Sequence, residues 1–166
     1  MARTLVLLRH AKAEPEGDLG DAQRPLATKG RKQATALGPR LAETVGTVDL
    51  ALVSSALRTS ETYKLVSQQL RVRVHEVRDE LYEASPRQVL AMLQELDADT
   101  STVLVVGHEP TMSHLAHLLH DTQDDLARQV SLGIPTAAAC ILEVPTARTD
   151  LDRSAAHLSQ LLRPEV

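Results

Sequence analysis

Continuous apolar runs alternate along the chain with segments whose apolar residues recur at helical spacing. Four such runs cover residues 4–8, 49–53, 102–106 and 137–144. Because they are continuous rather than alternating, they are typical of strands buried on both faces of a parallel sheet. Residues 71–77 alternate strictly and predict a strand with one wet face at the edge of that sheet.

Helical patterns fill the intervals between the predicted strands. They cover residues 28–41, 56–70, 85–96, 110–119 and 153–162. The Gly38–Pro39 pair should kink or split the first helix, since proline cannot donate a backbone hydrogen bond. Strands that alternate with helices predict an α/β fold, a three-layer α/β/α sandwich with a mostly parallel central sheet. At 166 residues, the chain is expected to form one domain, residues 1–166.

Composition excludes several classes of function. A net charge of -4 argues against a general binder of nucleic-acid phosphates, and two tyrosines as the only aromatics offer little for base stacking. The single cysteine, Cys140, excludes an internal disulfide. No signal segment and no apolar run of 18 residues is visible, so we expect a cytoplasmic protein without membrane contact.

Polar residues that follow three of the predicted strands offer candidate chemistry. Arg9 and His10 follow the first run, Arg58 the second and His108 the third. Each could simply be a surface residue at a strand end. However, ligands of parallel sheets lie beyond the carboxyl ends of the strands, and this one rule brings all four residues to a common site.

Two guanidinium groups and two imidazoles would form a cationic pocket suited to a tetrahedral oxyanion such as phosphate. A neutral histidine there can attack phosphorus, while the arginines neutralise charge on the phosphoryl oxygens. The sequence has no glycine-rich phosphate loop and no carboxylate cluster for Mg²⁺, so we expect neither a metal nor a cofactor. His114, His117 and His120 span about 120° of a helix and cannot share one narrow face.

Five blocks of sequence resemble the histidine phosphatase superfamily, whose members share the phosphoglycerate mutase-like fold. They are LVLLRHAKAE (5–14), RPLATKGRKQA (24–34), SSALRTSET (54–62), ELYEASP (80–86) and VVGHEPTMS (105–113). The short chain and the first two blocks look most like the SixA-type phosphohistidine phosphatases of bacteria. The resemblance implies that His10 is the nucleophile, that Arg9 and Arg58 bind the phosphoryl oxygens, and that His108 completes the pocket.

The resemblance also places a general acid at Glu83. Glu80 is a neighbouring candidate, and both could instead be exposed carboxylates near a helix N-terminus. Lys12 is a candidate substrate contact or a solvated side chain. The polar loop at residues 17–21 is either a mobile connection or a rim of the site.

We therefore expect a metal-independent phosphatase that forms a covalent phosphohistidine, with activity that falls at acid pH. The five blocks nearly fill the chain, which leaves no room for a substantial cap insertion. An open pocket would admit a phosphorylated side chain, so phosphohistidine on a signalling protein of the histidine phosphotransfer type is the expected substrate. The alternatives are small phosphate esters or nucleotides, and a non-catalytic module that binds phosphate.

Overall fold

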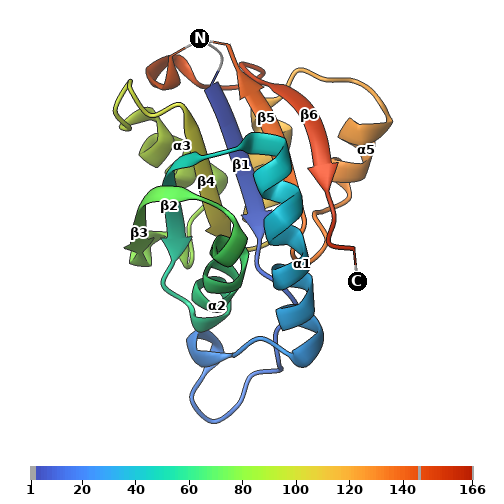
Figure 1. The fold of residues 1–166 in the computed structure, drawn as a ribbon. Helices are drawn as coiled ribbons and strands as arrows, with labels where there is room; N and C mark the ends of the chain where they lie inside the picture. The colour runs from blue at the N-terminus through green and yellow to red at the C-terminus, as the bar shows by residue number, and fades with distance from the viewer. Residues whose placement is uncertain (1–2, 146, 166) are drawn as a thin grey trace.

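Six strands form one sheet in the part of the chain that the computed structural model describes, residues 3–145 and 147–165 (Figure 1). The strands are β1 (Arg3–Arg9), β2 (Val48–Ser54), β3 (Val72–Arg78), β4 (Thr102–Gly107), β5 (Ala139–Val144) and β6 (His157–Leu162). Their order in the sheet is β3-β2-β4-β1-β5-β6. The first four run parallel, β5 is antiparallel to β1, and β6 is antiparallel to β5. The predicted mostly parallel sheet is confirmed.

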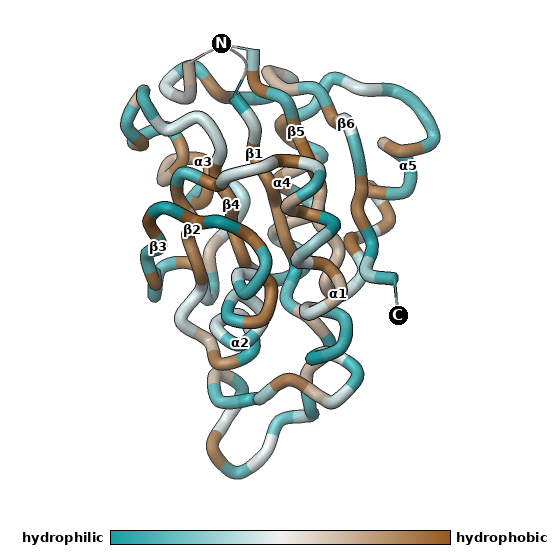
Figure 2. The backbone as a smooth tube through the Cα atoms, viewed as in Figure 1, coloured by the Kyte–Doolittle hydropathy of each residue, from teal (hydrophilic) through white to brown (hydrophobic). Residues whose placement is uncertain are grey.

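Helices cover both faces of this sheet. They are α1 (Thr28–Val45), α2 (Leu57–Val66), α3 (Pro86–Gln94), α4 (Thr111–Leu119) and α5 (Asp125–Ser131). Alternate residues of β1 enter two cores: Val6 and Leu8 pack with α1 and α2, and Leu5 and Leu7 with α3, α4 and α5. Figure 2 shows this central apolar strand between the two helical layers. Among the described residues, no helix has both the length and the apolarity to cross a bilayer.

The helix predicted at residues 153–162 is wrong, because the second part of this segment, His157–Leu162, forms strand β6. β6 pairs with the outer edge of β5, and an extra residue at Ser159 interrupts the register opposite Ile141 and Leu142. Because of this bulge, Leu158 faces the α4 side of the sheet and Leu162 the α1 side. Buried and exposed side chains therefore do not alternate regularly along β6, and the spacing of its leucines resembles that of a helix.

Two further expectations fail in part. α1 is not split at Gly38 and Pro39 but runs through both as one helix. A Cβ on Gly38 would lie 2.7 Å from the carbonyl oxygen of Val66, so this glycine allows α1 to approach the end of α2. β3 does lie at the sheet edge, but Val74 and Val77, on opposite faces, are both more than half exposed.

Candidate active site

The four residues predicted from the strand ends meet at one edge of the sheet. Arg9 ends β1 and pairs in register with Gly107, which ends β4, and the N–H of His10 donates to the Gly107 carbonyl at 3.1 Å. His108 follows β4, and its ring centroid is 5.5 Å from that of His10. Arg58 lies in the first turn of α2 and, like Arg9, acts electrostatically on His10.

His10 is a buried, neutral imidazole. Its Nδ1 lies 2.7 Å from the Ala11 carbonyl oxygen, which can only accept, so Nδ1 donates and Nε2 carries the lone pair. The pKa of His10 is lowered from 6.5 to about 4, chiefly by burial; the Ala11 hydrogen bond acts in the opposite direction, and the charges of Arg58 and Arg9 add to the lowering. At neutral pH the ring is therefore uncharged, with Nε2 free to act as a base or nucleophile.

Helices α1 and α2 hold the loop that follows His10. The N–H of Ala11 donates to Thr62 Oγ1, and the N–H of Lys12 donates to Gln33 Oε1, both at 3.0 Å. A Cβ on Gly30 would lie 2.0 Å from the Lys12 carbonyl oxygen, so only glycine fits there. Gly30 and Gln33, from the second sequence block, thus position the histidine loop.

A second loop positions Arg9. Its Nη1 donates to the Ile134 carbonyl at 3.0 Å. The N–H of Ile134 in turn donates to Glu109 Oε2 at 3.0 Å, and Glu109 Oε1 accepts from the N–H of Ser113. Nε of Arg9 is buried without a partner among the described residues, so a donor remains for an anion.

His108 is held by a serine that the sequence analysis did not single out. Its Nε2 lies 2.8 Å from Oγ of Ser54, the fully buried residue that ends β2. Burial, followed by the charge of Arg58, lowers the pKa of His108 from 6.5 to about 3. Nδ1 is buried and has no partner in the described part of the chain. The available signal for Ser54 was a polar residue directly after an apolar run.

Asp21 is the least expected member of the site. Its carbonyl oxygen accepts from Arg58 Nη1 at 2.8 Å, and its Oδ2 accepts from Arg58 Nη2 at 3.0 Å. The hydroxyl of Tyr82 donates to the same Oδ2, and Arg24 Nη1 donates to Oδ1 at 3.2 Å. These hydrogen bonds, that from Tyr82 first, lower the pKa of Asp21 to about 2. The loop at 17–21 therefore contributes an ionised carboxylate to the site.

The remaining candidates lie around this centre. Glu83 lines a neighbouring cavity of about 600 Å³ together with Asp79 and Tyr82. Glu80 lines the same cavity and forms an ion pair with Arg78 at 2.7 Å. The side chain of Lys12 is exposed. Catalytic or binding roles for these three residues stay predictions.

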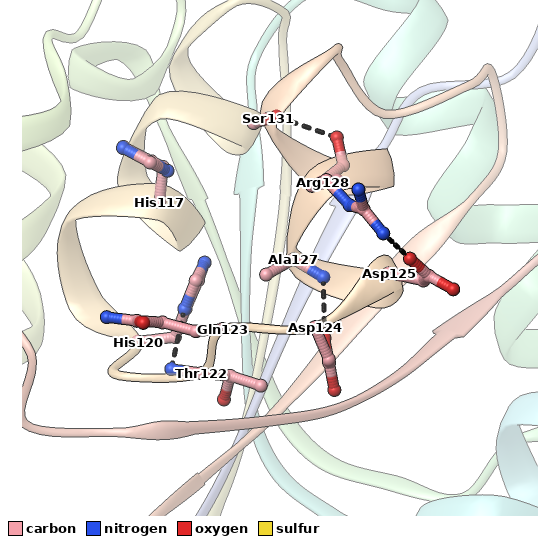
Figure 3. Close-up of a pocket in the computed structure, with 9 residues that line it drawn as sticks. All are labelled: His117, His120, Thr122, Gln123, Asp124, Asp125, Ala127, Arg128 and Ser131. Atoms are coloured by element: carbon pink, nitrogen blue, oxygen red, sulfur yellow. Dashed lines mark hydrogen bonds and ion pairs between the residues drawn. The ribbon is translucent and has the colours of Figure 1, made fainter.

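A larger cavity, of about 640 Å³, lies elsewhere, between α4 and α5 (Figure 3). Its lining includes His117 and His120, whose rings are nearly perpendicular with centroids 5.8 Å apart, but none of the four predicted residues. Within residues 3–145 and 147–165, no three histidine, cysteine or acidic side chains are grouped so that they could hold a metal ion.

Comparison with solved structures shows similarity along the whole chain. A protein from Nakamurella multipartitia, provisionally assigned as the phosphohistidine phosphatase SixA, is 33% identical with a TM-score of 0.85, over 100% of this chain and 98% of that one. A SixA protein from Agrobacterium tumefaciens, also provisionally assigned, is 26% identical with a TM-score of 0.81, over 98% and 99%. A third, SixA complexed with tungstate, has a TM-score of 0.79 over 97% of each chain, and at 22% identity supports the fold alone.

Sequence comparison agrees. The uncharacterised protein Rv1276c of Mycobacterium tuberculosis is 32% identical over 154 residues, which cover 91% of this chain and 96% of that protein. The profile of the histidine phosphatase superfamily (branch 1) matches residues 5–87. The phosphoglycerate mutase-like fold expected from the five blocks is confirmed. The chain belongs to the histidine phosphatase superfamily, branch 1, and is a phosphatase.

Proposed function

We propose that the protein removes phosphoryl groups from phosphohistidine on a partner protein, through a covalent intermediate on His10 and with no metal ion. The observation that carries the proposal is the state of His10: a buried, uncharged ring with Nε2 free, beside two guanidinium groups. Such a ring is a nucleophile, and the surrounding positive charge suits the dianionic group that it attacks.

In the first step, Nε2 of His10 attacks phosphorus in line, and the bond to the leaving nitrogen breaks with its electron pair. Nε–H groups of Arg9 and Arg58, both buried and without a partner among the described residues, donate to the phosphoryl oxygens. When the Ser54 hydroxyl donates to Nε2 of His108, Nδ1 of that ring carries a proton and donates as well.

In the second step, water attacks phosphorus, and the bond from phosphorus to Nε2 breaks. The electron pair returns to Nε2, and the water oxygen with both protons leaves as dihydrogen phosphate. His10 regains its neutral form, with the proton still on Nδ1. Neither step requires a metal ion or a cofactor.

Phosphohistidine suits this site because the first step transfers a phosphoryl group between two imidazoles. The leaving ring keeps the proton on its other nitrogen, so no general acid is needed. A phosphate ester, in contrast, leaves as an alkoxide that must be protonated, a role that we propose for Glu83. Similarity to the SixA proteins, one of them at 33% identity, supports the same substrate class.

The test compares substrates on the purified protein. We expect kcat/KM for a phosphorylated histidine phosphotransfer domain to exceed that for sugar phosphates and nucleotides, and EDTA to leave it unchanged. Arg58→Ala should lose about a hundredfold or more in kcat, as when an oxyanion donor is removed. Faster turnover of a small ester would instead identify a metabolite phosphatase. Tight phosphate binding without turnover would identify a binding module.

A further inference from the structure

Asp21 holds one edge of the Arg58 guanidinium. Its carbonyl oxygen and Oδ2 accept from Nη1 and Nη2 at 2.8 and 3.0 Å. Nε of Arg58 is left without a partner among the described residues. The arginine is thus fixed by one anionic residue and still offers donors to a second anion.

The carboxylate of Asp21 is more exposed than the arginine that it holds. The Asp21 side chain is 40% exposed, whereas that of Arg58 is 8% exposed. Tyr82 donates to Asp21 Oδ2, and its ring stands perpendicular to that of His108 with centroids 5.6 Å apart. The charge of Asp21 also acts on His108, so this exposed carboxylate lies at the edge of the site where a leaving group can meet it.

An ionised carboxylate at this position discriminates between leaving groups. It repels one that departs as an anion, although Arg24 offsets part of the repulsion at Oδ1. It attracts one that carries an N–H or a positive charge, because charge-assisted hydrogen bonds are the stronger ones. Asp21 also cannot supply a proton at neutral pH, since its pKa is held at about 2.

We infer that Asp21 is a specificity-determining residue, whose carboxylate accepts a hydrogen bond from the free ring N–H of the departing imidazole. This inference rests on the proposed function. In the step that it assists, the bond from phosphorus to the leaving nitrogen breaks, and the electron pair stays on that nitrogen. The other ring nitrogen keeps its proton, which is hydrogen-bonded to Asp21 throughout.

The experiment measures kcat/KM for phosphoimidazole and for p-nitrophenyl phosphate. Both leaving groups depart without a general acid, but only imidazole carries an N–H. Asp21→Asn should lower kcat/KM about tenfold on phosphoimidazole, the effect of one charge-assisted hydrogen bond, and should not lower it on p-nitrophenyl phosphate. Inhibition by inorganic phosphate should be unchanged or stronger, because Arg58 stays in place and a negative charge is removed.

Asp18→Asn is the matched control, because it removes the same charge from an exposed position in the same loop. Circular dichroism and thermal melting establish folding, and Asp21→Ser replaces Asp21→Asn if the latter does not fold. The inference would be overturned if Asp21→Asn lost kcat/KM equally on both substrates and were inhibited more weakly by phosphate. It would also be overturned if the ratio of the two kcat/KM values were the same in Asp21→Asn as in the wild-type protein. Wild-type protein that hydrolyses only p-nitrophenyl phosphate would instead overturn the proposed phosphohistidine substrate.

Discussion

Burial of a neutral His10 makes the stability of the protein depend on pH. Its pKa is lowered to about 4 by burial and by the nearby arginines, against 6.5 for an exposed histidine. Between these values the unfolded chain binds a proton that the folded chain does not. The free energy of unfolding therefore falls as the pH falls from above 6.5 toward 4, and this loss is complete below pH 4.

The size of the effect follows from the shift. Each pKa unit corresponds to about 1.36 kcal/mol, so the full loss is about 3 kcal/mol, of which about 2.5 kcal/mol is reached at pH 4.5. His10→Gln removes this contribution because glutamine does not titrate. His108, buried and neutral like His10, stays in both proteins, so its contribution largely cancels in the comparison.

Urea denaturation at pH 7.5 and pH 4.5 tests this prediction. The wild-type protein should lose about 2.5 kcal/mol more than His10→Gln between the two pH values. His114→Gln is the matched control, because His114 lies exposed on α4 and its replacement should leave the wild-type loss unchanged. Equal losses for wild type and His10→Gln would refute the assignment of His10 as a buried neutral base.

Three further substitutions test other parts of the site. Ser54→Ala removes the hydrogen bond to the second histidine and should lower kcat/KM on phosphoimidazole about tenfold; a change under twofold would contradict its role in fixing that ring. Gly30→Ala places a methyl group against the Lys12 carbonyl and should lower the free energy of unfolding by about 1–3 kcal/mol, as measured by urea denaturation. Gly17→Ala is the control, because a methyl group there meets open space and should leave the free energy of unfolding unchanged. Glu83→Gln should slow hydrolysis of an alkyl phosphate and leave phosphoimidazole hydrolysis unchanged; unaltered rates on both would remove Glu83 from the proposed mechanism.

The strand ends could be located from the sequence because their physical signal is local. Continuous apolar runs end just before Arg9 and just before Gly107, and the parallel register places these two residues side by side. That rule alone brings Arg9, His10, Arg58 and His108 to one edge of the sheet. The edge position of β3 followed from strict alternation in the same way.

Other features depend on contacts between distant segments, and the sequence carries little local signal for them. The bulge at Ser159 switches the face of β6, so the spacing of Leu158 and Leu162 indicated a helix. Asp21 is one of several polar residues in its loop, and only the fold places it against Arg58 and Tyr82. The sequence alone does not distinguish Asp21 from Asp18 in the same loop, because only the folded chain brings Asp21 into contact with its partners.

We propose that Nε2 of His10 attacks phosphorus, because Nδ1 donates to the Ala11 carbonyl. The most direct measurement is ³¹P nuclear magnetic resonance of the denatured protein after rapid quenching at alkaline pH during turnover of phosphoimidazole, with His10→Asn as the control. We expect a phosphohistidine linked through Nε2 in the wild-type protein and none in His10→Asn. A phosphoryl group on Nδ1 or on another residue, or turnover by His10→Asn at the wild-type rate, would contradict it.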